Sequence, residues 1–241
     1  MLEKSRERSN QGLFAVEGIQ ENRMALENKF EAELFFLQQD IFQNQINLPA
    51  VETLFVSQQV FQKIAYRSTT EGVIGVYKPK TFSLTDIQNQ KNALLVILES
   101  VEKPGNLGAV LRSADAAGAD AVIVCDARSD FFNPNVIRSS VGTIFTQTIV
   151  ATSKESIVQF CEEYGIQILP TYLGENSQNL YDCDLTQSTA LVFGTESQGL
   201  SDFWLQHNHG VKIPMAGQVD SLNVSNAVAV ALFEAVRQRS L

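Results

Sequence analysis

Residues 93–126, ALLVILESVEKPGNLGAVLRSADAAGADAVIVCD, decide the fold class of this chain. The stretch begins and ends with continuous apolar runs, ALLVILES and DAVIVCD, and a glycine loop and a helical segment lie between them. Later runs of the same kind are IQILPTY, TALVFG and GVKIPM. Continuously apolar, β-branched strands are typical of parallel sheets that helices cover on both faces. We therefore predict an α/β domain with a parallel sheet over residues 93–241.

A smaller unit precedes this domain. GLFAVEG, AELFFLQQ, VETLFVS and GVIGVYKP have the length and composition of strands, and IQENRMALENK and QQVFQKIAYRS have helical spacing. Residues 81–92, TFSLTDIQNQKN, are polar and without periodicity. The sequence therefore predicts a small α/β domain over residues 1–80, a linker over 81–92 and the larger domain over 93–241.

Composition is that of an ordinary globular protein, with 44% hydrophobic and 19% charged residues. The charged start lacks the apolar core expected of a signal peptide, and no apolar run approaches the roughly 20 residues that cross a bilayer. The three cysteines are far apart, which favours a reducing cytoplasm and argues against a zinc site. His207 and His209, the only histidines, have no cysteine or acidic cluster beside them. We expect a cytoplasmic protein without a membrane span or bound metal.

The net charge of −9 weighs against a nucleic-acid partner, because phosphate binding is largely electrostatic. The charge is uneven along the chain. Residues 1–80 contain nine Lys/Arg and ten Asp/Glu, whereas residues 81–241 contain nine and seventeen. If the protein binds RNA, the first segment is the better candidate for the contact.

Two stretches place an arginine on a helix that follows a polar loop. PGNLG, residues 104–108, follows a strand and leads into a helix with Arg112. Strand, glycine loop and helix is how dinucleotide-binding folds hold pyrophosphate, but the spacing here is GxxG and no Walker lysine follows. Asn133 and Pro134 begin a second, short helix that carries Arg138. Each stretch alone is more typical of a capped helix with a solvated arginine, Asn106 being the cap in the first.

Two further stretches contain groups that a ligand could use. GTESQGL, residues 194–200, follows a buried strand, where ligands bind in open α/β sheets, and its glycines permit close approach of the backbone. Ser221, Asn223, Ser225 and Asn226 precede an apolar helix. One N-cap requires only one such residue. The surplus indicates side chains directed at something outside the backbone.

In order and spacing, the four stretches resemble the characteristic motifs of the SpoU/TrmH family of RNA ribose 2′-O-methyltransferases, within the SPOUT superfamily. The matching segments are NLGAVLRSADAAG, NPNVIRSSVG, FGTESQGLS and IPMAGQVDSLNVSNAVAVALFE. Residues 12–80 resemble the substrate-binding domain often fused ahead of such enzymes. One motif could arise by chance, but four in order are specific. The chain departs from the family at Ser197, where a glycine is common.

The resemblance implies a deep trefoil knot in the C-terminal part of the catalytic domain, S-adenosyl-L-methionine as methyl donor and a homodimer through the knotted domain. The strand and helix pattern alone predicts an unknotted Rossmann-like fold. The implied catalytic residues are Asn106, Arg112, Glu196, Ser221 and Asn223. The implied cofactor-binding residues are Phe193, Gly194, Thr195, Glu196, Gly199, Ile213, Pro214, Met215, Leu222, Asn223 and Ser225.

The implied acceptor is a ribose 2′-hydroxyl of structured RNA. The family assigns the central role to the arginine at Arg112, but a guanidinium stays protonated in proteins. We therefore expect Arg112 to hold a substrate phosphate through two hydrogen bonds, with the proton passing to phosphate or water. Asn106 would position the nucleotide, and Glu196 would hold the loop or Arg112. The candidate RNA contacts are Arg112, Arg138, Arg6, Arg8 and Arg23, with Lys4, Lys29, Lys63 and Arg67 as further candidates.

Other functions stay open from the sequence. Family analogy favours large-subunit ribosomal RNA over transfer RNA as the substrate. A Rossmann-like dinucleotide enzyme would use the PGNLG loop and an acidic ribose ligand such as Asp126 or Asp130. A non-catalytic RNA-binding factor would keep the fold alone, which the acidic balance mildly favours and the intact motif residues oppose.

Overall fold

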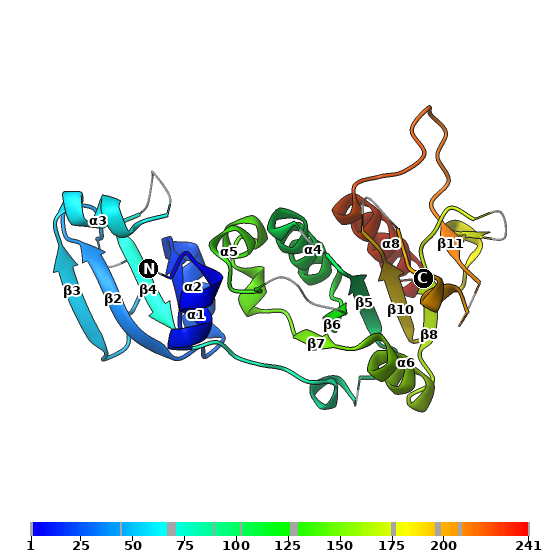
Figure 1. Ribbon diagram of the computed structural model, residues 1–241, viewed down its shortest axis with the longest axis horizontal. Coiled ribbons are helices and arrows are strands. Elements are labelled where there is room, and N and C mark those ends of the chain that lie inside the picture. Colours follow the sequence, from blue (N-terminus) through cyan, green and yellow to red (C-terminus); the bar gives the residue numbers. More distant parts are fainter. Residues whose placement is uncertain are drawn as a thin grey trace. The chain divides into compact units, whose positions relative to one another are not determined.

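The computed structural model describes two units of the chain (Figure 1). Unit 1 contains Met1–Lys80 and Asp130–Thr146, and unit 2 contains Thr81–Ser129 and Gln147–Leu241. The described residues are all except 1, 44, 67–70, 89, 102, 126–129, 175–176, 196–198, 207–208 and 241. None of the helices in these ranges combines the length and hydropathy that crossing a bilayer requires.

Unit 2 is built on a five-stranded sheet in the order β7-β6-β5-β10-β8, and every neighbouring pair is parallel. The strands are β5 (Leu94–Glu99), β6 (Ala121–Cys125), β7 (Ile149–Thr152), β8 (Gln167–Pro170) and β10 (Thr189–Phe193). The prediction of a parallel α/β sheet is confirmed. The central pair, β5 and β10, comes from distant parts of the sequence, so the loops that follow these two strands meet at one edge of the sheet.

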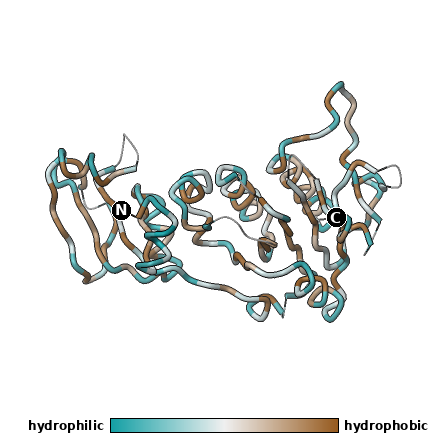
Figure 2. Tube along the Cα trace, viewed as in Figure 1, coloured by the Kyte–Doolittle hydropathy of each residue, from teal (hydrophilic) through white to brown (hydrophobic). Residues whose placement is uncertain are grey.

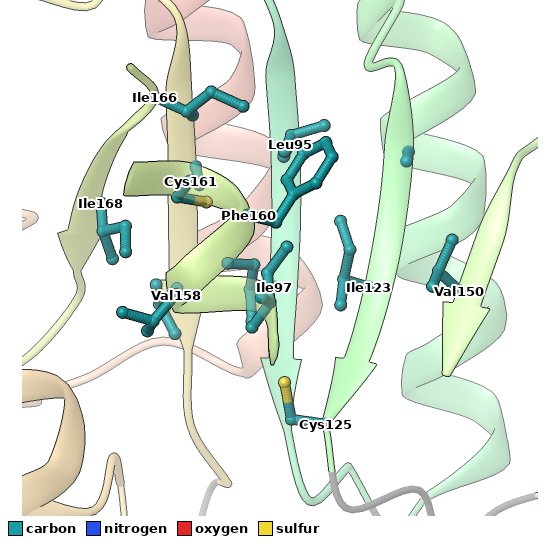
Figure 3. Close-up of a cluster of buried hydrophobic side chains, with 14 of the residues drawn as sticks. Leu95, Ile97, Ile123, Cys125, Val150, Val158, Phe160, Cys161, Ile166 and Ile168 are labelled. Carbon is teal, nitrogen blue, oxygen red and sulfur yellow. The ribbon is translucent and has the colours of Figure 1, made fainter. Parts of the chain in front are cut away.

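Helices cover both faces of this sheet, which explains why its strands are apolar throughout. The helices are α4 (Pro104–Ala117), α6 (Lys154–Glu163), α7 (Asp202–Leu205) and α8 (Val224–Arg239). Figure 3 shows α6 in front of the strands, with Val158 and Phe160 against Leu95 and Ile97, and α4 and α8 behind. The strands of this sheet are among the most hydrophobic parts of the chain (Figure 2).

One run predicted to be a strand of this sheet lies elsewhere. GVKIPM contributes only β11 (Val211–Lys212), which pairs with β9 (Gln178–Asn179) in a separate two-stranded sheet. The rest of the run, from Ile213, continues as irregular chain toward α8. The predicted linker also contains structure, since Ile87 in its short 3₁₀ helix (Leu84–Ile87) is buried in the unit 2 core.

Unit 1 has a four-stranded mixed sheet in the order β1-β4-β2-β3. Its strands are β1 (Phe14–Glu17), β2 (Ala32–Gln38), β3 (Glu52–Val56) and β4 (Val73–Tyr77), and its first three helices are α1 (Ser5–Gln11), α2 (Ile19–Glu27) and α3 (Gln58–Ile64). Asn22 of α2 accepts a hydrogen bond from the Tyr77 hydroxyl at 2.8 Å. A Cβ on Gly75 would lie 2.3 Å from the same amide oxygen, so β4 requires glycine where α2 crosses it.

Asp130–Thr146 belongs to unit 1, although the sequence places it inside the continuous C-terminal domain. The segment contains α5 (Pro134–Ser140) and a 3₁₀ turn (Thr143–Phe145). Phe132 and Phe145 stack on Phe14 of β1, with ring centroids 4.1 and 6.2 Å apart. This aromatic packing holds the second motif, with Arg138, in the same unit as the first 80 residues.

The same segment corrects one predicted RNA contact. Arg8 is only 5% exposed. Its Nε lies 2.6 Å from the Asp130 carboxylate, and its Nη1 donates to the Leu2 carbonyl. Arg8 therefore stabilises unit 1 and does not present its guanidinium to a ligand. The trefoil knot implied by the resemblance stays a prediction.

Candidate active site

The first motif begins α4 of unit 2. Lys103 occupies the N-cap position and Pro104 follows it in the first turn, so Asn106 lies inside the helix and is not its cap. Leu107 and Leu111 face the core. Arg112 is on the exposed side, and no hydrogen bond or ion pair involves it within the described ranges. Its guanidinium is therefore accessible to a ligand.

The fourth motif contains the N-cap of α8, where Asn223 has two functions. Its Oδ1 accepts hydrogen bonds from the Ser225 backbone N–H at 3.0 Å and from the Ser225 hydroxyl at 2.7 Å. Its Nδ2 donates to Oδ1 of Asn106 at 3.3 Å. One asparagine thus starts α8 and links it to the first turn of α4. Asn106 and Asn223, two of the implied catalytic residues, are thus brought together, whereas the Ser225 hydroxyl donates to the capping oxygen of Asn223.

The third motif forms a closed turn after β10. The Thr195 N–H donates to the Gly199 carbonyl at 3.1 Å and the Gly199 N–H donates back to the Thr195 carbonyl at 2.9 Å. A Cβ on Gly194 would lie 2.1 Å from Gly199 backbone atoms, and Gly199 has a φ of +68°. Both positions therefore require glycine. The predicted Glu196, with Ser197 and Gln198, lies outside the described residues.

Residues 213–222 lead into α8, and their backbone is not paired with other described segments. None of their N–H or C=O groups makes a hydrogen bond to the described part of the chain. Ser221 and Pro214 are exposed, as are the apolar side chains of Val219 (66%) and Leu222 (36%). Free peptide groups beside apolar side chains fit a ligand with flat faces and a polar edge, such as the adenosine part of S-adenosyl-L-methionine.

Glu99, at the end of β5, is a site residue that the sequence reasoning missed. It is 5% exposed, and it accepts hydrogen bonds from Lys154 Nζ at 2.9 Å and from the Ser201 N–H and hydroxyl at 2.8 and 2.6 Å. Burial alone would raise the pKa of Glu99, but the hydrogen bonds from Ser201 and Lys154 outweigh it and hold that pKa below its usual range. Ser201 occupies the N-cap position of α7, yet its hydroxyl makes no cap hydrogen bond and donates to Glu99 instead. The sequence feature that could have indicated Glu99 is a single carboxylate at the end of an otherwise apolar strand.

The carboxylate of Glu99 therefore fixes the chain just after the paired residues Thr195 and Gly199. Ser201 is two residues beyond Gly199, and both its N–H and its hydroxyl donate to Glu99 at the end of the neighbouring strand. Phe193, the last residue of β10, is buried, while Gly194 and Thr195 are half-buried. Ile213 and Met215 are half-buried as well. The arrangement offers two backbone segments for a ligand at the carboxyl edge of a parallel sheet.

The remaining predicted residues are dispersed. Arg138 is exposed but belongs to unit 1. Of the predicted RNA contacts in the first 80 residues, those that are exposed are Lys4, Arg6, Arg23, Lys29 and Lys63. Arg67 lies outside the described residues, as do Asp126 and His207. Asp130, the alternative ribose ligand of a dinucleotide enzyme, is paired with Arg8. The described residues contain no group of three His, Cys, Asp or Glu that could hold a metal ion.

Two family models match the chain: SpoU rRNA Methylase family over residues 93–233 and MRM3-like substrate binding domain over residues 1–75. The 23S rRNA (guanosine-2'-O-)-methyltransferase RlmB of Pasteurella multocida is 35% identical over 204 residues, 81% of this chain and 83% of that protein. The 23S rRNA (uridine(2479)-2'-O)-methyltransferase of Streptomyces viridochromogenes is 35% identical over 173 residues, 69% and 60% of the two chains. An AdoMet-bound rRNA methyltransferase from Sinorhizobium meliloti superposes with a TM-score of 0.88 at 28% identity, covering 98% of this chain and 91% of that one.

Proposed function

The chain belongs to the SpoU rRNA methylase family, and on this basis we propose that it transfers a methyl group from S-adenosyl-L-methionine to a ribose 2′-hydroxyl of ribosomal RNA. The observation that carries the proposal is the link between motifs. Asn223, at the end of the segment with free backbone groups, contacts Asn106 on the helix that presents Arg112. One hydrogen bond thereby connects the proposed donor-binding segment to the helix with the proposed phosphate-binding side chain.

The donor-binding residues are those whose backbone is exposed or tightly turned. We assign the adenosine to the peptide groups at Phe193, Gly194 and Thr195 and to the free N–H and C=O groups of residues 213–222, with Leu222 against the base. When bound, S-adenosyl-L-methionine supplies an electrophilic methyl group on a sulfonium. Glu196 and Ser221 are further proposed members of this site.

Arg112 orients the acceptor. Its planar guanidinium can donate two parallel hydrogen bonds to one phosphate of the RNA, which fixes the position of the adjoining ribose. Orientation of this kind is effective because methyl transfer needs the attacking oxygen in line with the methyl carbon at near-attack distance. A guanidinium does not accept the hydroxyl proton, so the proton passes to phosphate or water. Asn106, held by Asn223, positions the nucleotide.

The proposed substrate is large-subunit ribosomal RNA, as the names of the two relatives indicate for those proteins. One of them is named for guanosine and the other for uridine, so the proposal extends to the RNA and not to the methylated base. We assign RNA recognition to residues 1–80 and catalysis to residues 93–241. The exposed cations Arg6, Arg23 and Arg138 are the proposed phosphate contacts outside α4.

We also propose that the protein is a cytoplasmic homodimer that joins through the catalytic domain. Phe233 of α8 is 49% exposed, an apolar side chain that a second copy could cover. Size-exclusion chromatography with light scattering tests this, and the mass of one chain would contradict it.

Transfer of a radiolabelled methyl group from S-adenosyl-L-methionine to purified ribosomal RNA tests the central proposal. We expect label in 23S rRNA at a ribose 2′-oxygen, mapped by resistance of one phosphodiester to alkaline cleavage. Arg112→Ala should bind the donor in calorimetry and transfer no label. A parental chain that binds the donor but labels no RNA would contradict the proposal.

A further inference from the structure

Residues 194–200 connect the end of β10 to Ser201, the N-cap position of α7. β10 and β5 pair in parallel with Phe193 opposite Leu98, so Glu99, one residue further, lies beside the point where the chain leaves β10. The side chain of Glu99 also binds Ser201, at the other end of the connection. One residue of β5 therefore stands beside the start of this segment and is bonded to its end.

Both carboxylate oxygens of Glu99 accept hydrogen bonds from Ser201. Oε1 accepts from the Ser201 hydroxyl at 2.6 Å, and Oε2 accepts from the Ser201 N–H at 2.8 Å. Lys154 Nζ lies 2.9 Å from Oε1 and supplies the opposite charge that a carboxylate only 5% exposed requires. Hydrogen bonds to an ionised group are stronger than those between neutral groups, and two of them fix direction as well as distance. Ser201 is therefore held in both position and orientation.

The helix that follows is anchored to the core by apolar contacts. Trp204 is fully buried, and Leu200 and Phe203 pack against the same hydrophobic core from the two sides of Ser201 in the sequence. Burial of apolar surface is non-directional, so these contacts keep α7 on the core without fixing the orientation of the Ser201 peptide group. Loss of the Glu99 contact should therefore leave α7 in place and loosen only the chain before it.

That chain has no room for a loosened end. Thr195 and Gly199 exchange two backbone hydrogen bonds, at 3.1 and 2.9 Å. The backbone at Gly194 lies so close to Gly199 that an added Cβ would be 2.1 Å from its atoms. Ser201 is only two residues beyond Gly199, so the position of Ser201 determines whether this close pairing can be kept.

We propose that Glu99 is a positioning residue for the methyl donor, which holds Ser201 so that Gly199 stays paired with Thr195. The inference rests on the proposed function, which assigns the peptide groups at Gly194 and Thr195 to the adenosine of S-adenosyl-L-methionine. If the pairing is kept in only a fraction of the chains, the apparent dissociation constant of the donor rises in inverse proportion to that fraction. A bound donor selects the paired form, so the rate at saturating donor should change little.

Calorimetry with S-adenosyl-L-methionine on the full-length chain tests the proposal. The Ser201 hydroxyl does not cap α7, so Ser201→Ala removes only its bond to Glu99. It should weaken donor binding about tenfold, the loss expected of one hydrogen bond to a charged group. Ser201→Thr keeps the hydroxyl, and because Ser201 is exposed the added methyl group has room, so this variant should bind with parental affinity. Glu99→Gln directs an N–H₂ group at one of the donors and should weaken binding at least as much as Ser201→Ala.

Two further measurements separate positioning from stability. The double variant Glu99→Gln/Ser201→Ala should bind the donor about as weakly as Glu99→Gln alone, because both substitutions act on one contact. Methyl-transfer kinetics should show a raised KM for the donor with little change in kcat. A purely structural contribution of Glu99 would lower the unfolding temperature and leave the donor affinity of the folded chain unchanged.

Glu234→Gln is the matched control. Glu234 is 7% exposed, and its carboxylate accepts hydrogen bonds from Arg237 and Gln238, which lie on the same helix, α8. Its replacement should alter stability without changing the donor affinity. Circular dichroism establishes that each variant is folded at the temperature of the calorimetry. An equal loss of donor affinity in Glu234→Gln and Glu99→Gln would show a general effect of stability and overturn the proposal.

The outcomes distinguish this inference from the proposed function. Parental donor affinity in folded Ser201→Ala and Glu99→Gln overturns the role of Glu99 and leaves the proposed function intact. A parental chain that binds the donor but labels no RNA contradicts the proposed function, and the affinities of the variants still decide the role of Glu99. A parental chain that binds no S-adenosyl-L-methionine contradicts both.

Discussion

Asn223 donates a hydrogen bond from Nδ2 to Oδ1 of Asn106 at 3.3 Å, across 117 positions of the sequence. The same side chain caps α8 through Oδ1. Loss of Asn223 therefore has two separable consequences, one for stability and one for the position of Asn106.

Two substitutions of Asn223 distinguish its effect on stability from its effect on the position of Asn106. Serine is about as good an N-cap as asparagine, whereas alanine costs roughly 1 kcal/mol of helix stability. Asn223→Ser should therefore keep the parental free energy of unfolding but lose methyl transfer, because its shorter side chain does not reach Asn106. Asn223→Ala should lower the free energy of unfolding and should also lose methyl transfer. Denaturant unfolding and methyl-transfer kinetics check this, and a fully active Asn223→Ser enzyme would show that the link has no catalytic value.

Arg112→Ala should abolish methyl transfer with no change in the affinity for S-adenosyl-L-methionine, because the side chain is exposed and makes no hydrogen bond or ion pair in the described part of the fold. Arg112→Lys should restore only part of the rate, since an ammonium cannot donate two parallel hydrogen bonds to one phosphate. Calorimetry measures donor affinity, and single-turnover labelling measures the rate. Parental transfer by Arg112→Ala would remove this residue from the mechanism.

Gly194→Ala should abolish donor binding while most of the fold survives. The added Cβ would lie 2.1 Å from the Gly199 backbone, so the turn between them must open. Gly105→Ala is the matched control, because a Cβ at that position of α4 meets nothing within 4 Å. Calorimetry with S-adenosyl-L-methionine should give parental affinity for the control and none for Gly194→Ala. Similar affinities in both would mean that the turn is not part of the donor site.

The buried carboxylate of Glu99 predicts a pH dependence. Its hydrogen bonds to Ser201 and Lys154 lower its pKa in the folded chain relative to the unfolded chain, in spite of burial. This stabilisation is complete above the unfolded value of about 4.3 and is lost as pH falls through the lower folded pKa. Thermal unfolding of the parent between pH 3 and 7 should therefore show a loss at the acid end that Glu99→Gln reduces. A larger acid loss in Glu99→Gln would reverse the sign and contradict the interpretation.

Arg8 and Arg6, on the same helix, should respond in opposite ways. Arg8→Ala removes the ion-pair partner of Asp130 and should lower the free energy of unfolding by about 2 kcal/mol. Arg6→Ala removes an exposed cation, so it should change stability by less than about 0.5 kcal/mol and weaken RNA binding at low salt. Urea unfolding and RNA titrations at two salt concentrations measure both effects. Equal destabilisation by the two substitutions would contradict the assignment of Arg8 to the fold.

The amino-acid sequence by itself determined the parallel sheet of unit 2, because a strand buried on both faces needs continuous apolar residues, as in β5 from Leu94 to Leu98 and in β10 from Ala190 to Phe193. It also predicted the strands of unit 1. Only the tertiary structure decided that Asp130–Thr146 packs on β1, that Arg8 is buried, and that Glu99 holds Ser201. The physical reason is that periodicity records whether a residue is buried and not which distant residue buries it. Aromatic stacking, a buried ion pair and a shared carboxylate depend on partners brought together by the fold.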